Sequence, residues 1–260
     1  MSDEPQFPAP IPVTGVVAAD HFLRHAYATV PGMSSRFAAA VCGRLLRLQT
    51  EFGIAGPIAE IGTFEGRFFI ALGHCLEPGE IALGIDLFEW PNAQCLDRFE
   101  ANCLKHGLTA NRRITWKTDS RTMVPADIIA KVGGKKLRFF HIDGDHSRDA
   151  LTCDLERATA VMAPEGIIVL DDMLHPGYPT LMVAVQQWLE RNPDWCPLAI
   201  LDRETIVAAT KFVLCRREIF KRYEARMLEI FQPNIWPLGA DFEPHWCLVL
   251  GLDTRLAAIT

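Results

Sequence analysis

The sequence predicts an α/β domain of the Rossmann-like, doubly wound type, in which helices cover both faces of a mostly parallel sheet with an antiparallel strand at its edge. Three observations predict this fold. Short apolar strands alternate with helical stretches between residues 57 and 190. Two further strand-like runs follow, with a connection too short for a crossover helix. Apolar residues make up 49% of the 260 residues and charged residues 22%, which is typical of a globular protein.

A helix over residues 34–52 precedes the alternation. Phe37, Val41 and Leu45 recur there at helical spacing, and arginines fall largely between the apolar positions. The helix is therefore amphipathic and can cover a sheet edge. The glycine-containing segment 53–56 then ends it.

Five strands and five helices alternate after this first helix, and each strand is a short apolar run. The predicted strands are 57–61, 82–86, 114–117, 137–143 and 166–171. The predicted helices are 66–75, 95–106, 125–132, 148–162 and 180–190. This alternation predicts a parallel sheet, because each helix carries the chain back to the start of the next strand.

The C-terminal part is predicted to pack on the same domain. Residues 197–201 and 210–216 are expected to form an antiparallel hairpin at the sheet edge, and residues 217–231 a charged surface helix. Residues 245–252 either add a strand or pack as an apolar tail.

The predicted organisation has three parts along the chain. They are an N-terminal arm that is partly extended, the α/β domain with its covering helix, and a C-terminal helix and tail, at residues 1–33, 34–216 and 217–260. The arm is rich in proline up to about residue 17, so that part is expected to be extended or poorly ordered.

Charge and composition exclude several classes of protein. The chain has 26 Lys and Arg against 32 Asp and Glu, a net charge of −6, so it lacks the basic surface of a nucleic-acid binder and would be repelled by anionic membranes. It contains no apolar run long enough to span a membrane and no basic, secretory-type start, so a cytoplasmic location is expected. The eight cysteines show no C-x-x-C pair and are expected to be reduced and buried.

The first informative motif is a glycine turn between a strand and a helix, Glu60-Ile61-Gly62-Thr63-Phe64-Glu65-Gly66. Gly62 would let the backbone approach a ligand closely, and the start of the following helix would offer N–H groups to an anion. An ordinary tight turn is the alternative. Phe64 occupies the middle position of the dinucleotide fingerprint G-x-G-x-x-G, which argues against a dehydrogenase.

An acid stands at the tip of the next predicted strand. Asp86 follows Gly62 by 24 residues, and Leu87 comes directly after it. A carboxylate at this place can accept hydrogen bonds from both hydroxyls of a ribose. Asp86 could instead cap the next element, but its spacing from the glycine turn favours the ligand.

Three carboxylates and a histidine stand at the tips of two neighbouring strands. Asp143 and His146 follow one strand, and Asp171 and Asp172 end the next. The carboxyl ends of parallel strands meet at one edge of a sheet, so these acids would repel one another without a cation. A hard divalent cation such as Mg²⁺ takes carboxylate oxygens as ligands, and the three aspartates are the candidates. Helix caps and loop turns are the alternative.

Together these motifs resemble a class I S-adenosylmethionine-dependent methyltransferase over roughly residues 55–190. The glycine turn is similar to that of the catechol and caffeoyl-CoA O-methyltransferases, whereas the segments around Asp143 and Asp171 look more like the macrocin-type tailoring methyltransferases. Catechol-type enzymes have Lys in place of His146 and Asn in place of Asp172, which argues against a small catechol as substrate. The resemblance implies a seven-stranded sheet whose last strand is antiparallel, in agreement with the predicted hairpin.

The resemblance also implies which residues hold the cofactor. The glycine turn would hold the methionine end of S-adenosylmethionine, Asp86 the ribose, and Asp119 with Ser120 would lie beside the adenine. The expected cofactor-binding residues are Glu60, Gly62, Thr63, Phe64, Gly66, Asp86, Leu87, Asp119, Ser120 and Asp143.

By the same resemblance Asp143, Asp171 and Asp172 would bind Mg²⁺, with His146 as the general base. The expected function is Mg²⁺-dependent methyl transfer from S-adenosylmethionine to a hydroxyl of a small molecule or natural product. Two alternatives are a metal-binding, hydroxylase-like relative of the same fold and a catalytically silent cofactor-binding domain; an NAD enzyme ranks last. The acceptor and the oligomeric state, homo-oligomers included, stay open.

Overall fold

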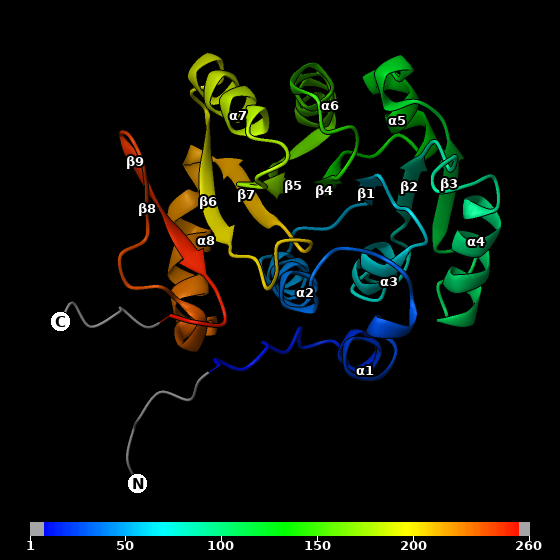
Figure 1. Ribbon diagram of the computed structural model, residues 1–260, viewed down its shortest axis with the longest axis horizontal. Helices are drawn as coiled ribbons and strands as arrows, with labels where there is room; N and C mark the ends of the chain where they lie inside the picture. The colour runs from blue at the N-terminus through cyan, green and yellow to red at the C-terminus, as the bar shows by residue number, and fades with distance from the viewer. Residues whose placement is uncertain (1–7, 255–260) are drawn as a thin grey trace, which may run out of the picture.

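The computed structural model describes residues 8–254 as a central twisted sheet between two layers of helices (Figure 1). The strands are β1 Ile58–Ile61, β2 Ala82–Asp86, β3 Arg113–Lys117, β4 Leu137–Ile142, β5 Met162–Met173, β6 Trp195–Leu201, β7 Thr210–Arg216, β8 Ala240–Phe242 and β9 His245–Leu250. The α-helices are α1 Val17–His25, α2 Arg36–Glu51, α3 Arg67–Gly73, α4 Cys95–Lys105, α5 Pro125–Lys131, α6 Arg148–Val161, α7 Thr180–Arg191 and α8 Arg217–Ile230. Short 3₁₀ turns are η1 Tyr27–Thr29, η2 Ser120–Thr122 and η3 Gln232–Asn234.

The sheet has the strand order β3-β2-β1-β4-β5-β7-β6-β9-β8. Strands β1 to β5 run parallel, and β7 pairs antiparallel with both β5 and β6. The predicted α/β fold class and the antiparallel hairpin are confirmed, but the sheet of the described residues has nine strands rather than the seven that the resemblance implies. The hairpin is not the edge of the sheet, however, because β9 pairs in parallel with β6 and β8 pairs with β9. Of the two expectations for residues 245–252, the strand is correct.

Two hydrophobic clusters hold the helices on the sheet, one on each face. Helices α5, α6 and α7 cover one face, and α2, α3, α4 and α8 cover the other, with α1 packed outside α2 and α3 (Figure 1). Helix α2 begins at Ser35, whose side chain accepts a hydrogen bond from Ala38 N at 3.0 Å, a cap typically worth about 1 kcal/mol. Phe37, Val41 and Leu45 are fully buried, as their spacing predicts.

The N-terminal arm is extended only in part. Residues 1–7 lie outside the described residues; from residue 8 the chain is non-helical up to α1, and Ala9 N donates a hydrogen bond to Leu252 O at 2.8 Å. No helix is predicted before residue 34, yet α1 buries Phe22 and Leu23 in the cluster with α2 and α3. The two apolar side chains bury too much surface for this segment to remain extended.

Three sequence expectations concern features outside the sheet. All eight cysteines are free, and seven of them are buried, as predicted. Helix α8 packs on the sheet through Ile219, Phe220, Tyr223 and Met227. Within residues 8–254, no helix is long and apolar enough to cross a membrane.

A half-buried histidine under α1 makes stability depend on pH. Burial, and next the charge of Arg112, lowers the pKa of His74 to about 4, and its ring lies 5.4 Å from that of Phe22. The unfolded chain takes up a proton below pH 6.5, whereas folded His74 stays neutral down to about pH 4. Stability is therefore expected to fall by about 3 kcal/mol between pH 7 and pH 4 from this group alone. Urea unfolding should show that His74→Gln removes this part of the acid loss; an identical pH slope in the variant would contradict the assignment.

The register of the parallel strands brings the functional segments to one edge. Ile61 lies opposite both Ile85 and Ile142, and Ile142 lies opposite Leu170. The next residue on each of these four adjacent strands is a member of a predicted motif, namely Gly62, Asp86, Asp143 and Asp171. The carboxyl edge of the sheet is thus where the predicted site assembles.

Candidate active site

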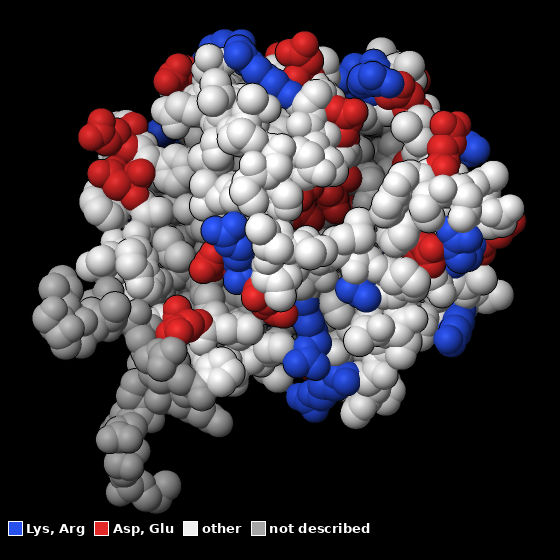
Figure 2. Space-filling view, viewed as in Figure 1, with Lys and Arg blue, Asp and Glu red and all other residues white. Residues whose placement is uncertain are grey.

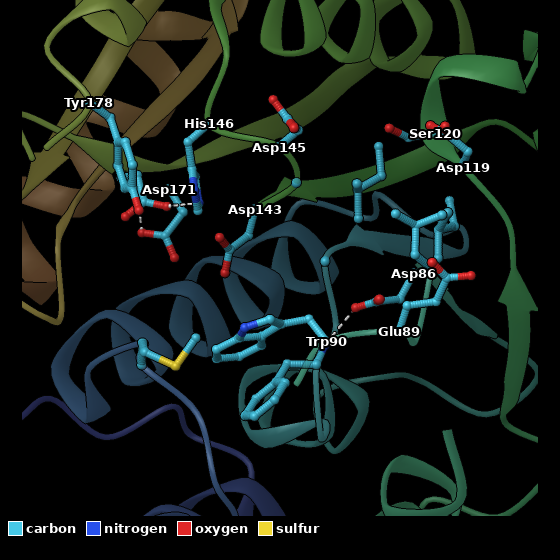
Figure 3. Close-up of a pocket in the computed structure, with 18 of the residues that line it drawn as sticks. Asp86, Glu89, Trp90, Asp119, Ser120, Asp143, Asp145, His146, Asp171 and Tyr178 are labelled. Atoms are coloured by element: carbon cyan, nitrogen blue, oxygen red, sulfur yellow. Dashed lines mark hydrogen bonds and ion pairs between the residues drawn. The ribbon is translucent and has the colours of Figure 1, made fainter. Parts of the chain in front are cut away.

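A cavity of about 760 Å³ opens at the carboxyl ends of β1, β2, β4 and β5. Figure 2 shows acidic side chains at the bottom of the hollow on this face. Figure 3 shows that Asp143 lies between two groups of side chains that line it, with Asp86 on one side and His146 on the other. The cavity therefore has two halves that share one carboxylate.

The glycine turn forms the floor between these halves. Gly62 has a φ of +81°, and a Cβ atom placed on it would lie 1.6 Å from the backbone oxygen of Asp143. Only glycine fits there, because the turn after β1 touches the end of β4. Phe64, with a φ of +48°, follows in the left-handed region, and its ring packs against Trp90 at 5.0 Å between centroids.

Asp86 is held rigidly at the end of β2. One carboxylate oxygen accepts a hydrogen bond from Phe64 N at 2.8 Å, and the other accepts one from Phe88 N at 2.7 Å. Burial raises the pKa of Asp86, and the backbone N–H donors oppose this rise. Each oxygen keeps a lone pair for a further donor, and Asp86 lines the cavity together with Leu87.

Asp119 and Ser120 line the cavity beyond β3. The Asp119 carboxylate caps η2, accepting a hydrogen bond from Arg121 N at 2.9 Å, and pairs with the Arg121 guanidinium at 2.7 Å. The hydrogen bond from Arg121 lowers the pKa of Asp119, so this group stays a carboxylate. Ser120 Oγ lies 3.3 Å from Asp154, whose pKa burial raises to about 6.

Three residues of the predicted cofactor set lie outside the cavity lining, namely Glu60, Thr63 and Gly66. Glu60 is 2% exposed, and its Oε1 lies 3.0 Å from Nδ1 of His141. Burial raises the pKa of Glu60. Glu60 lies within β1, a strand that is fully buried, so its side chain faces His141 of the neighbouring strand rather than the cavity.

The acids of the other half have unequal surroundings. Asp171 pairs with the buried ammonium of Lys211, and its Oδ2 also accepts a hydrogen bond from Ser34 Oγ at 3.2 Å. Asp172 Oδ2 lies 2.7 Å from Nε2 of His146. The Asp143 carboxylate receives no hydrogen bond from residues 8–254. Burial, and next the negative charge of Asp171, raises the pKa of Asp143 well above its usual range.

His146 stands at the mouth of this half. Its ring stacks on Tyr178 at 4.2 Å between centroids, and Tyr178 stacks in turn on His175 at 4.7 Å. The hydrogen bond to Asp172 raises the pKa of His146. His175 and Tyr178, which follow β5, thus reach the cavity, and Tyr178 packs against the His146 ring.

Two overlapping groups of side chains could hold a cation, each with its ligand atoms within 4.8 Å of one another. One is His141, Asp143 and Asp171, and the other is Asp143, His146 and Asp172. The predicted set of three aspartates is not one such group in the described residues. Asp171 and Asp172 point to different neighbours although they are adjacent in the chain.

A family model described as a methyltransferase domain matches residues 59–173, the stretch from β1 to the end of β5. This stretch carries the glycine turn, Asp86 and all three predicted metal ligands. Residues 59–173 are therefore similar to a methyltransferase domain. No curated protein sequence matches the chain.

Solved structures agree with this methyltransferase fold. A putative O-methyltransferase from Klebsiella pneumoniae superposes with a TM-score of 0.53 at 19% identity, covering 77% of this chain and 89% of that one. The O-methyltransferase TomG from Streptomyces achromogenes, in complex with SAM, superposes with a TM-score of 0.51 at 18% identity, covering 77% of this chain and 89% of that one. An O-methyltransferase from Bacillus cereus, in complex with SAH, gives 0.52 at 17%, with 77% and 90% covered.

The candidate site contains further residues that belong to none of the sequence motifs. Lys211 and Ser34 contact Asp171, and Glu89 lines the half of the cavity that contains Asp86. Lys211 could have been noticed as the one charged side chain inside the apolar run Thr210–Cys215. Its partner, 40 residues away, could not have been identified from that run.

Proposed function

We propose that the chain is an S-adenosylmethionine-dependent O-methyltransferase that acts on a hydroxyl of a small molecule, with a divalent cation such as Mg²⁺. The observation that carries the proposal is the two-part cavity, in which the turn-and-carboxylate half meets the acid–histidine half at Asp143. Its volume of about 760 Å³ leaves room for an acceptor beside a cofactor.

The cofactor half fits a nucleoside with a charged tail. Two backbone N–H groups fix the orientation of the Asp86 carboxylate, so its remaining lone pairs are preorganised to accept hydrogen bonds from a ribose. Asp119 and Ser120 line the same cavity as Asp86, which supports a contact with the adenine, and Gly62 would let the ligand approach the backbone. We therefore keep Gly62, Phe64, Asp86, Leu87, Asp119, Ser120 and Asp143 as the proposed cofactor-binding residues.

The acid half fits a hard cation. The Asp143 carboxylate is half-buried and lacks a protein donor among the described residues, and the negative charges of Asp171, Asp172 and Glu60 act on it against the single positive charge of Lys211, so a cation would satisfy it. When bound, S-adenosylmethionine supplies an activated methyl group, and the cation supplies positive charge beside the acceptor oxygen.

His146 is the proposed general base. It lies at the cavity, its Nε2 is 2.7 Å from Asp172, and Tyr178 fixes the plane of its ring. Neutral histidine can take the proton from an acceptor hydroxyl near neutral pH. Trp90, Tyr178 and Met33 contribute apolar surface to the cavity lining, which would help to exclude water from the transfer.

The test is ligand binding followed by turnover. Calorimetry should detect S-adenosylmethionine and S-adenosylhomocysteine at micromolar affinity, about 7–8 kcal/mol. A screen with methyl-labelled cofactor against phenolic and sugar hydroxyls should then find an acceptor, and excess chelator should stop turnover while leaving S-adenosylhomocysteine affinity unchanged. Binding of NAD in place of both ligands would refute the proposal.

Asp86→Ala is expected to weaken S-adenosylhomocysteine binding by about 2–4 kcal/mol, because two hydrogen bonds to a charged acceptor are lost. Asp97→Ala is the matched control, since Asp97 is an exposed acid on α4 outside the cavity. Calorimetry on both variants, with thermal melting to confirm that each is folded, makes the comparison. Equal affinity in the two variants would remove Asp86 from the proposed cofactor site.

A further inference from the structure

A buried lysine stands directly behind the acid half of the cavity. Lys211 is 0% exposed, and its Nζ lies 3.1 Å from Ser34 Oγ, 3.1 Å from His141 Nε2 and against Asp171 Oδ2. An ammonium has three N–H donors, so each one has a partner here. The ring of Phe68 covers it at 4.6 Å, which completes a closed, dry environment.

The strand pairing explains why only one of the two adjacent aspartates meets this lysine. Leu170 pairs with Phe212 and Met173 pairs with Thr210, so Asp171 and Asp172 together lie opposite the single residue Lys211. Such a bulge turns successive side chains in different directions. Asp172 has a φ of +57°, and its carboxylate contacts His146, whereas that of Asp171 contacts Lys211.

The Lys211 ammonium already supplies a positive charge to one of the two candidate cation-binding groups. In the group of His141, Asp143 and Asp171, Lys211 contacts both His141 Nε2 and Asp171. Since Nε2 accepts from the ammonium, Nδ1 of His141 carries the hydrogen and donates to Glu60. Burial lowers the pKa of Lys211, but the charges of Asp171 and Asp143 outweigh this and raise it. The group of Asp143, His146 and Asp172 has no such internal cation and lines the cavity.

We propose that Lys211 is a positioning residue that removes Asp171 from the metal-ligand set, so that a divalent cation meets Asp143 and Asp172 with His146 beside them. The inference rests on the proposed function, since it concerns the cation of that site. It assigns the three aspartates two different tasks: Asp171 anchors β5 to the lysine of β7, and the other two face the ligand.

The experiment measures the affinity of the full chain for Mn²⁺ without cofactor. Calorimetry gives the binding constant, and the electron paramagnetic resonance signal of the free ion gives an independent value. The variants are Lys211→Met, the double variant Lys211→Met/Asp171→Asn, and Lys135→Met as a control at an exposed lysine. The double variant should bind Mn²⁺ within about threefold of wild type, since it loses no ligand. Lys211→Met should bind about 10-fold tighter or more, because Asp171 becomes available.

Thermal melting gives a second readout. Lys211→Met leaves a buried carboxylate without its partner, so its Tm should fall by about 10 °C, and Mn²⁺ should restore more of this loss than it adds to wild type. If Lys211→Met does not fold, the double variant alone decides. A tenfold or larger loss of Mn²⁺ affinity in the double variant, or wild-type affinity in Lys211→Met, would overturn the inference. No Mn²⁺ binding by any variant would overturn it too, while intact S-adenosylhomocysteine binding would leave the methyltransferase proposal standing.

Discussion

Replacing His146 with alanine is expected to lower kcat by about 10²–10⁴-fold, the usual contribution of a general base. The reason is geometric: His146 lines the acid half of the cavity, and contacts with Asp172 and Tyr178 leave its ring little freedom. Affinity for S-adenosylhomocysteine should be unchanged, because the proposed cofactor residues lie in the other half. In wild type, kcat should rise with pH on the acidic side of the profile, because the base must be neutral to accept a proton. This acidic limb should be missing in the variant. Asp172 raises the pKa of His146, and a cation bound at Asp143 and Asp172 would oppose this rise by favouring the neutral ring.

His175→Ala is the matched control for this prediction. Both histidines line the cavity and stack on Tyr178, but only His146 contacts an acid of the site. The control should keep kcat within about threefold of wild type and retain the acid limb, since it removes packing on Tyr178 and leaves the proposed base in place. Loss of the limb in His175→Ala and its survival in His146→Ala would exchange the roles of the two residues.

The strand tips could be predicted because they depend on local pattern and on one rule of topology. The runs ending at Ile61, Asp86, Ile142 and Leu170 are short and apolar, and parallel strands must place their carboxyl ends together. Once the alternation was recognised, Asp86 and Asp143 therefore had to emerge near Gly62. The structure adds the contact between Gly62 and Asp143, which follows from the level register of β1 and β4.

The partners of the acids could not be predicted in the same way. Lys211 meets Asp171 only because β7 enters the sheet antiparallel beside β5 with a bulge, and neither the pairing nor the bulge has a signal in either segment alone. The motif predicts that Glu60 binds the cofactor. Its carboxylate instead faces His141, which lies on the adjacent strand β4. Helix α1 could not be predicted in this way, because it is short and directly follows the proline-rich start. Its apolar side chains become buried only by packing against α2 and α3.

Gly62→Ala is expected to destabilise the fold by about 3–5 kcal/mol and to weaken S-adenosylhomocysteine binding by about 100-fold. Two costs combine at this position. A φ of +81° strains any residue with a Cβ atom, and that atom would lie 1.6 Å from the backbone oxygen of Asp143, which no side-chain rotation can relieve. The ends of β1 and β4 would have to separate, and this movement displaces the Asp143 carboxylate at the junction of the two cavity halves.

Gly79→Ala separates the two costs. Gly79 has a similar φ of +84°, but a Cβ atom placed there meets nothing within 4 Å, so only the backbone strain remains, about 1 kcal/mol. Urea unfolding should therefore give Gly62→Ala a much lower free energy of unfolding than Gly79→Ala. Calorimetry should find that only Gly79→Ala keeps the wild-type affinity for S-adenosylhomocysteine. If the two variants lost equal stability, the close approach of β1 and β4 would not be what requires glycine at position 62, and the shared wall of the two cavity halves would have to tolerate a side chain.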